Sequence, residues 1–299
     1  MIKYLNDLIQ IANSQSKKKI VVAAAADLHV LEALKEAISL GIPEPILVGD
    51  KTQIKRISKS INLDLKNIEI IDEPDSIKAS IKSVTIIREG KAAILMKGLV
   101  ATGTLLKAVL DKEKGLQKGG LLSHVAFFET PYYHKILCLT DAAMNIKPNI
   151  DEKVAIVKNA VEACRKLGIE KPKVAILAAV ETVNPKMEAT LDAALLTQMN
   201  KRNQIKNCEI DGPLALDNII SKEAAEHKGI QSKVAGDADI ILAPDINVGN
   251  VFYKSLNFMG GAVSAAVIMG ARVPIILTSR SDSEKSKLMS IVLATAMKE

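Results

Sequence analysis

The sequence predicts an α/β protein with two doubly wound domains, each built on a sheet of mainly parallel strands. The first observation is an alternation of short apolar runs with amphipathic stretches of about ten to twenty residues, which is typical of parallel strands joined by right-handed helical crossovers. The second is composition. Apolar residues make up 48% of the chain and aromatic residues only 3%, so the core must be built from Ala, Val, Ile and Leu. The third is length, because 299 residues suffice for one large or two medium domains.

The first half of the chain shows this alternation clearly. Residues 2–12 space their apolar side chains as an amphipathic helix does. Apolar runs then predict four buried strands, at 20–25, 45–49, 68–72 and 92–98. Each is followed by helical periodicity, at 28–38, 51–61, 75–89 and 102–113. Two further strand-like segments, 121–128 and 135–141, follow one another without a clear helix between them, and Lys147-Pro148-Asn149 marks a boundary.

The alternation resumes after residue 150. The predicted elements are a helix over 151–168, a strand over 173–179, a helix over 185–202 that starts at Pro185, a short strand over 207–214 and a helix over 215–227. A strand over 238–245, a helix over 247–259, a second helix of small residues over 261–270, a strand over 273–277 and a final helix complete the chain. The small-residue segment is either a buried helix or an interface.

Charge and cysteine usage narrow the classes of ligand. The net charge of +6 is spread along the chain, and with few aromatic side chains we expect small anionic ligands rather than nucleic acid. The cysteines and histidines are too dispersed to predict a disulfide framework or a metal site. The N-terminal stretch lacks a continuous apolar segment with a cleavage site, and Arg272 interrupts the apolar stretch after Gly260. We therefore expect a cytoplasmic protein with no membrane span.

Four junctions at the carboxyl ends of predicted strands carry unusual polar residues, and in α/β folds ligands gather at such places. The first, KGLVATGTLLKAVL, follows a strand and opens a helix with residues suited to hold an anion: Lys97, Gly98, Thr102, Gly103, Thr104 and Lys107. An ordinary glycine turn with a threonine cap explains this segment equally well. The second junction is Asp211-Gly212-Pro213, for which a turn is the simpler interpretation.

The third junction, APDINVGNVFYKSL, concentrates polar groups at a helix start: Asp245, Asn247, Gly249, Asn250, Tyr253 and Lys254. Asp or Asn can cap that helix, but two Asn and a Gly exceed what one cap needs, which favours a ligand site. The fourth is LTSRSDSEKSKL. Ser281 and Glu284 fit a capping box, which leaves Thr278, Ser279 and Arg280 outside the helix. A guanidinium there suits a phosphate, and a hydroxyl suits a developing oxyanion.

These motifs together are similar to a known family. The segment VAGDADIILAPDINVGNVFYKSL, preceded by DGPLALDNI and followed by VPIILTSR, resembles the phosphate acetyltransferase and phosphate butyryltransferase family. The similarity extends to MKGLVATGTLLKAVL and LTDAAMNIKP, and the LTSRSDSEKSKL ending is closer to the butyryl (or branched-chain acyl) branch. The resemblance implies a two-domain fold like that of isocitrate and isopropylmalate dehydrogenases, with the active site in the interdomain cleft. It also implies a first domain of residues 1–138 plus 273–299 and an inserted second domain of residues 139–272.

The resemblance implies reversible transfer of an acyl group between CoA and inorganic phosphate, giving acyl phosphate and CoA. No metal or cofactor is expected, since acyl-CoA, CoA, phosphate and acyl phosphate are all substrates or products, and homo-oligomers are implied. Carried onto this sequence, Arg280 binds the phosphoryl group and Ser279 donates a hydrogen bond to the reacting centre. The expected substrate-binding residues are Gly98, Thr102, Gly103, Lys107, Asp211, Asp245, Asn247, Gly249, Asn250 and Lys254.

Two departures from the acetyl-type pattern bear on mechanism. Acetyl-type members carry an Asp at the position of Ser286, proposed to deprotonate the CoA thiol, and an Arg at the position of Lys107. The general base is therefore unassigned, with Asp282 and Glu284 as weak candidates and a positioned water, or a thiol pKa lowered by Arg280, as the alternatives. Lys107 keeps a positive charge but loses the bidentate fork of an arginine.

Three other functions remain open at this stage. Phosphate acetyltransferase is the nearest, because pocket walls set the acyl length. An NAD(P)-dependent, metal-dependent oxidoreductase would need clustered Asp ligands, which the sequence does not show, and turnover with Mg²⁺ and NAD(P)⁺ would reveal it. A catalytically silent binding protein on the same fold is disfavoured by the presence of both Ser279 and Arg280.

Overall fold

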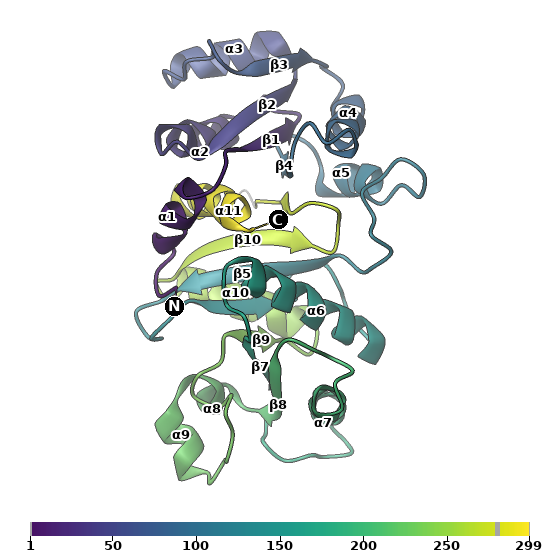
Figure 1. The fold of residues 1–299 in the computed structure, drawn as a ribbon, viewed down its shortest axis with the longest axis vertical. Helices are drawn as coiled ribbons and strands as arrows, with labels where there is room; N and C mark the ends of the chain where they lie inside the picture. Colours follow the sequence, from purple (N-terminus) through teal and green to yellow (C-terminus); the bar gives the residue numbers. More distant parts are fainter. Residues whose placement is uncertain (1, 279–281, 299) are drawn as a thin grey trace. The chain divides into compact units, whose positions relative to one another are not determined.

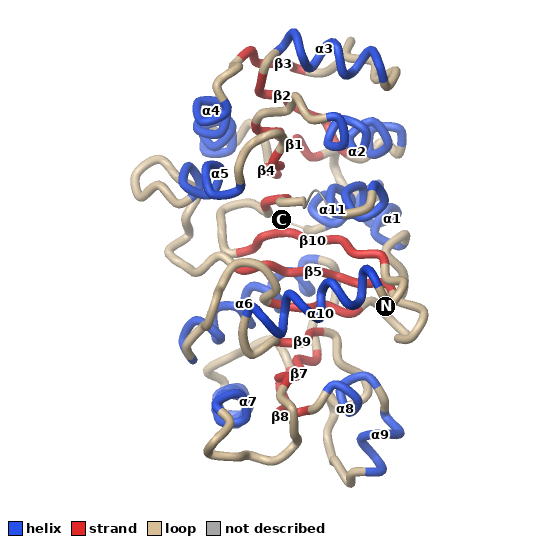
Figure 2. Tube along the Cα trace, turned by 180° about the vertical axis from the view of Figure 1, so that it is seen from behind, coloured by secondary structure: helices blue, strands red, loops and turns tan. Residues whose placement is uncertain are grey.

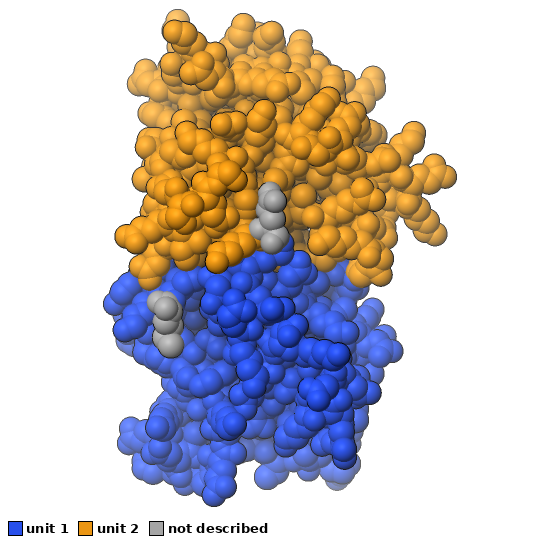
Figure 3. Space-filling model, in the orientation of Figure 1, with its two compact units in different colours: residues 1–5, 121–264, 299 blue, residues 6–120, 265–298 orange. Residues whose placement is uncertain are grey.

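The computed structural model describes residues 2–278 and 282–298 of the chain. Its contacts divide the chain into two compact units, which Figure 3 shows in different colours. The terminal unit consists of residues 6–120 and 265–298, and the inserted unit consists of residues 2–5 and 121–264. Each unit has a sheet with helices on both of its faces (Figure 1). The predicted α/β class is therefore confirmed.

The sheet of the terminal unit has the strand order β3-β2-β1-β4-β11-β10. Its strands are β1 (Lys18–Ala23), β2 (Pro43–Gly49), β3 (Glu69–Asp72), β4 (Ile94–Lys97), β10 (Val263–Met269) and β11 (Ile275–Ile276). All neighbours are parallel except β10 and β11, which pair antiparallel with Ile268 opposite Ile275. The central strand β1 is fully buried from Ile20 to Ala23, which is why it reads as an uninterrupted apolar run.

Helices cover both faces of this sheet. They are α1 (Asp7–Asn13), α2 (Leu28–Ser39), α3 (Lys51–Ser60), α4 (Ser76–Arg88), α5 (Thr102–Val109) and α11 (Glu284–Ala296). Asp27, Asp50 and Asp75 cap α2, α3 and α4, because each carboxylate accepts a hydrogen bond from a backbone N–H of the first turn. Helix α2 packs against α11, whereas α4 and α5 pack together on the opposite face (Figure 1). This is the arrangement that right-handed crossovers require.

The sheet of the inserted unit has the order β5-β6-β9-β7-β8. Its strands are β5 (Ser123–Glu129), β6 (Leu137–Thr140), β7 (Lys173–Leu177), β8 (Glu209–Leu214) and β9 (Ile240–Leu242), of which only β5 and β6 pair antiparallel. Its helices are α6 (Ile150–Lys166), α7 (Glu188–Lys201), α8 (Leu216–Ile220), α9 (Lys222–His227) and α10 (Ile246–Phe258). Helices α6 and α7 cover one face, and α8 and α10 cover the other (Figures 1 and 2).

The segment 261–270, expected to be a helix, is instead the strand β10. Two glycines with positive φ bound it, Gly261 at +59° and Gly270 at +96°, so the chain turns at both ends. Between them Val263, Val267 and Ile268 are β-branched and suit a pleated strand. The helix was predicted from the small residues alone, because the segment has no amphipathic period that would distinguish a helix from a strand. Its pairing with β11 also makes the sheet mixed rather than wholly parallel.

Three helix limits differ from expectation. Helix α7 begins at Glu188 rather than at Pro185, because Asn184 closes a turn by accepting hydrogen bonds from the N–H groups of Lys186 and Met187. The stretch 215–227 forms two short helices, since Ser221 leaves helical geometry and caps α9. The first helix starts at Asp7, although Leu5 is also buried.

The boundaries between the two units differ from the expected domain boundaries at 138/139 and 272/273. Strands β5 and β6 form an antiparallel pair within the inserted unit, so the chain enters this unit at residue 121. It returns to the terminal unit at residue 265, within the strand that pairs with β11. None of the helices described in the structure is long and apolar enough to span a membrane.

Candidate active site

The terminal unit has a topological switch point between the neighbouring strands β1 and β4. The helices that follow these strands, α2 and α5, cover opposite faces of the sheet (Figure 1). In open α/β sheets, ligands bind in the crevice outside the carboxyl ends of the two strands at such a point.

Gly98 lets the ends of these two strands approach each other closely. Its N–H donates a hydrogen bond to the carbonyl of Ala23 over 2.8 Å, and a Cβ atom at this position would lie 2.2 Å from the carbonyl oxygen of Ala24. Any side chain would therefore push β4 away from β1. The predicted importance of Gly98 has this structural cause, whatever ligand binds nearby.

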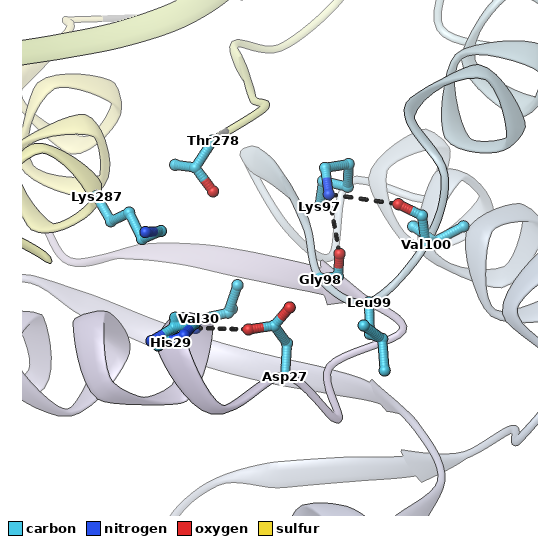
Figure 4. A pocket seen from close by; sticks show the side chains of 9 residues that line it. All are labelled: Asp27, His29, Val30, Lys97, Gly98, Leu99, Val100, Thr278 and Lys287. Carbon is cyan, nitrogen blue, oxygen red and sulfur yellow. Dashed lines mark hydrogen bonds between the residues drawn. The ribbon is translucent and has the colours of Figure 1, made fainter. Parts of the chain in front are cut away.

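A pocket lies at this switch point. It is open to solvent and is lined by Asp27, His29, Val30, Lys97, Gly98, Leu99, Val100, Thr278 and Lys287 (Figure 4). The carboxyl ends of β1, β4 and β11 each contribute, and α11 adds Lys287. The ammonium of Lys97 donates to the carbonyls of Gly98 and Val100 over 3.1 and 3.3 Å. Asp27 accepts the N–H of Val30 with Oδ1 at 3.2 Å.

Lys287 brings a second ammonium group to this pocket. Its side chain is buried, and Nζ donates to the carbonyl of Asp282 over 2.5 Å. An ammonium has three donor positions, and a buried one is costly unless anionic or polar partners surround it. Two lysines against one carboxylate, among the described residues of the lining, make the pocket suited to an anion such as phosphate.

Ser279 and Arg280 lie outside the described residues. Thr278, which precedes them, lines the pocket, so the chain leads from the pocket directly into this pair. The expected capping box of Ser281 and Glu284 is wrong. The N-cap of α11 is Ser283, whose Oγ accepts the N–H of Ser286 at 3.1 Å, and the helix therefore begins at Glu284. The sequence alone allows the helix to be capped by either residue, because a serine stands at both 281 and 283.

The other predicted residues after β4 do not line the pocket. Thr102, Gly103 and Lys107 are exposed on α5. The expected threonine cap is absent, because the N-cap is Ala101, which forms no capping hydrogen bond through its side chain. Gly103 has no atom within 4 Å of the place where a Cβ would stand, so no close backbone contact requires a glycine there.

The inserted unit has its own switch point, between β6 and β9, and the third predicted junction lies there. Asp245 is the N-cap of α10, and its carboxylate accepts the N–H groups of Asn247 and Val248 at 2.8 and 3.0 Å. Asn250 Nδ2 donates to the carbonyl of Ala142 over 3.1 Å. A Cβ on Gly249 would lie 2.2 Å from the carbonyl oxygen of Asp141, so α10 packs tightly on the loop after β6.

Sequence reasoning missed the residue that organises this loop. Asp141 is 3% exposed, and its carboxylate accepts hydrogen bonds from the N–H groups of Ala143, Met144 and Asn145 and from Asn145 Nδ2. Its signals in the sequence were its place directly after the apolar run of β6 and its presence in LTDAAMNIKP, one of the segments that resemble the family. The loop carbonyls that contact α10 are therefore held in fixed positions.

Asn247 and Lys254 are exposed on α10. Tyr253 packs inward, with its ring edge-to-face against Phe128 at 5.3 Å and its hydroxyl 3.3 Å from Ser264 Oγ. A turn was expected at Asp211, but this residue belongs to the strand β8, where it lies opposite Ala175. Its Oδ1 accepts the N–H of Gly212 at 2.9 Å.

One group of potential metal donors occurs among the described residues. His29, Glu32 and Glu284 place one donor atom each within 4.8 Å of one another. The sequence did not reveal it, since the two helices that carry these residues are far apart in the chain. His29 and Glu284 are exposed, and we assign no cation to the group.

Comparison with known proteins places these features in a family. A family model described as "Phosphate acetyl/butaryl transferase" matches residues 4–80 and 75–295. The chain is 48% identical over 294 residues to a phosphate butyryltransferase of Clostridium acetobutylicum, across 98% of each chain. It is 44% identical over 291 residues to a phosphate acetyltransferase of Thermotoga maritima, across 97% of this chain and 98% of the relative.

Solved structures agree with these relatives. A branched-chain phosphotransacylase from Enterococcus faecalis matches with a TM-score of 0.81 and 34% identity, over 94% of this chain and all of that one. A 4-hydroxythreonine-4-phosphate dehydrogenase from Klebsiella pneumoniae matches with a TM-score of 0.60 and 15% identity, over 94% of this chain and 100% of that one, which supports the predicted dehydrogenase-like fold alone. The family model and the relatives span most of the chain, and the protein therefore belongs to the phosphate acetyl/butyryl transferase family.

Proposed function

We propose that this protein transfers a butyryl or branched short-chain acyl group reversibly between CoA and inorganic phosphate. The observation that carries the proposal is the pocket at the β1/β4 switch point, where Lys97 and Lys287 meet the end of β11 just before Ser279-Arg280. Similarity to enzymes named phosphate butyryltransferase and branched-chain phosphotransacylase supports the choice of acyl group.

The proposed reaction asks for positioning and charge neutralisation. In one direction the CoA thiolate attacks the carbonyl carbon of the acyl phosphate, and phosphate leaves from the tetrahedral intermediate. Lys97, Lys287 and Arg280 neutralise the phosphate, so that it becomes a better leaving group. Ser279 donates a hydrogen bond to the oxyanion. The reverse direction uses the same contacts, with phosphate as the nucleophile and CoA as the leaving group.

We propose that CoA and phosphate take part as substrates and that no cofactor is needed, because acyl transfer involves neither oxidation nor reduction. Residues of α5 and α10 that the pocket lining does not include, among them Lys107 and Lys254, remain proposed contacts to CoA. Both are exposed cations and suit the phosphates of a nucleotide.

Phosphate acetyltransferase is the second candidate, since a relative of that name is 44% identical. One methylene changes discrimination by only about 1–3 kcal/mol, so overlapping activities are expected. The test follows CoA release from acetyl-, propionyl-, butyryl- and isobutyryl-CoA with a thiol reagent, with and without phosphate. We expect phosphate-dependent release that is fastest for the four-carbon groups. Fastest release from acetyl-CoA would reassign the substrate, and no phosphate-dependent release would contradict the proposed reaction.

We also propose that the protein is cytoplasmic and assembles as a homo-oligomer. The three cysteines are buried thiols, in keeping with a reducing compartment. Helix α10 and its C-cap leave Val251, Phe258 and Met259 at least 65% exposed, an apolar surface that a second copy could cover. Light scattering on the purified protein tests the assembly, and a monomeric mass at micromolar concentration would contradict it.

A further inference from the structure

The proposed transfer needs a group that takes the proton of the CoA thiol. A free thiol has a pKa of about 8.5, so only a few per cent is thiolate at neutral pH. The position at which acetyl-type members carry an Asp is Ser286 in this chain. Ser286 is 6% exposed, and its Oγ lies 3.0 Å from the Oγ of the capping Ser283. It belongs to the start of α11 and has no basic group.

The two carboxylates closest in sequence do not replace it. Neither Asp282 nor Glu284 lines the pocket among the residues that the structure describes. Glu284 is exposed and lies beside His29 and Glu32. A side chain that acts as the base would therefore come from another segment of the chain.

Asp27 meets the requirement from the end of β1. It supplies the one carboxylate among the described residues that line the pocket. Oδ1 is used to cap α2, whereas Oδ2 forms no hydrogen bond with a described residue and is turned toward the open space of the pocket (Figure 4). The charged and titratable groups around it are His29 on α2, Lys97 at the end of β4 and Lys287 on α11.

We propose that Asp27 is the general base of the transfer, an inference that rests on the proposed function. Oδ2 takes the proton from the CoA thiol while the sulfur forms its bond to the acyl carbon. The carbon–oxygen bond to phosphate then breaks, and the phosphate leaves with the bonding electron pair. In the reverse direction the protonated carboxyl returns the proton to the departing CoA sulfur. The side chains of Lys97 and Lys287 contact the phosphate.

His29 is the alternative base in the lining. Its side chain is 59% exposed, and Nδ1 lies 3.3 Å from Glu32 Oε2, on the outer side of α2. A His29→Gln variant therefore belongs in the test. If the imidazole were the base, this variant rather than an Asp27 variant would lose the proton-transfer step.

The experiment compares Asp27→Asn with Asp50→Asn. Asparagine caps a helix about as well as aspartate, so both variants keep their caps and their fold. Asp50 caps α3 through the same contact, a backbone N–H at 2.9 Å, and does not line the pocket. Thioester formation from butyryl phosphate and CoA is followed between pH 6 and about 9, and melting temperatures check the fold of each variant.

We expect Asp27→Asn to lower kcat about 10²- to 10⁴-fold at pH 7, the usual contribution of general-base catalysis. Without a base, the rate depends on the thiolate already present, so the defect should shrink about tenfold per pH unit until CoA ionises near pH 8.5. A structural defect would give a loss that does not change with pH. Asp50→Asn should keep the rate and the pH profile of the unaltered protein. His29→Gln should keep the shape of the pH profile, because its proton-transfer step is intact.

Two failures are distinguishable. If the unaltered protein forms no thioester, the proposed function is overturned and the role of Asp27 with it. If the unaltered protein turns over but Asp27→Asn stays within about threefold of it, or loses activity equally at every pH, the assignment of Asp27 alone is overturned. If His29→Gln rather than Asp27→Asn shows the pH-dependent loss of rate, the base is the His29 imidazole and not Asp27.

Discussion

Gly98 and Gly103 follow the same strand, but the structure requires a glycine only at Gly98. A Cβ on Gly98 would meet the backbone of Ala23 and Ala24, whereas a Cβ on Gly103 would meet nothing within 4 Å. Neither has a positive φ, so conformational freedom does not explain them. Gly98 allows β1 and β4 to approach closely, whereas the first turn of α5 has open space beside Gly103.

We predict that Gly98→Ala lowers the free energy of unfolding by about 1–3 kcal/mol, because overpacking forces the two strand ends apart. Gly103→Ala should stabilise the protein by up to about 1 kcal/mol, since alanine loses less entropy in a helix than glycine. Denaturant unfolding measures both. Equal stability of the two variants would contradict the close approach at Gly98. If Gly103→Ala raises the KM for CoA despite its added stability, the substrate approaches this turn closely.

Single residues of the site differ in how far the sequence could reveal them. Asp245 stands at the start of a predicted helix, and its capping role follows from local sequence. Asp27 and Lys287 line one pocket although they stand far apart in the chain, and no local pattern reveals that they meet. The junctions after the strands stay predicted ligand sites, and the reason for choosing them is that parallel strands bring their carboxyl ends to one edge of the sheet.

At the scale of elements, the start of α11 decides how the chain after Thr278 enters its helix. Ser283 accepts the N–H of Ser286, and we predict that Ser283→Ala costs about 0.5–2 kcal/mol of stability through the lost cap. Ser283→Asn should restore most of it. Thermal unfolding of the two variants is the measurement, and a Ser283→Ala protein as stable as the unaltered one would contradict this cap.

Buried strands and amphipathic helices were predictable for physical reasons. Strand β1 is buried on both faces, so its sequence is a continuous apolar run. Helix α2 buries one face, so its apolar residues recur at helical spacing. Strand β10 was predicted as a helix because its small residues carry no period, and its state depends on pairing with β11. The apolar pattern over 215–227 is continuous and predicts one helix. The chain instead leaves helical geometry at Ser221, which caps the second helix, α9.

At the scale of the whole molecule, the inserted unit is held at the amino ends of its strands by a network of charges. Burial raises the pKa of Asp237, but hydrogen bonds from Lys173, Lys135 and His134 outweigh it and hold this pKa well below its usual 3.8. Lys135 is 4% exposed and also binds Asp239 at 2.6 Å. The network ties the segments that precede β6, β7 and β9 together.

The sign of its pH dependence follows from the lowered pKa. A carboxyl with a depressed folded pKa stabilises the protein fully above its unfolded pKa, here about 3.8, and loses this effect as the pH falls through the folded value. We predict that Asp237→Asn lowers the melting temperature at pH 7 and that the difference narrows below about pH 4. The effect is modest, because Asp237 is 40% exposed and solvent screens it. Glu170→Gln, at an exposed and loose ion pair, should change little at either pH.

The most direct test of the account asks whether the switch-point pocket binds the phosphate. Lys287 and Lys285 stand on the same helix, but Lys287 is buried at the pocket and Lys285 is exposed. We predict that Lys287→Gln raises the KM for phosphate at least about tenfold with little change in the KM for butyryl-CoA, since the loss of one charged hydrogen bond costs about 1.5–3 kcal/mol. Lys285→Gln should leave both values unchanged. Equal phosphate KM values for the two variants, with both proteins folded, would contradict the pocket as the phosphate site.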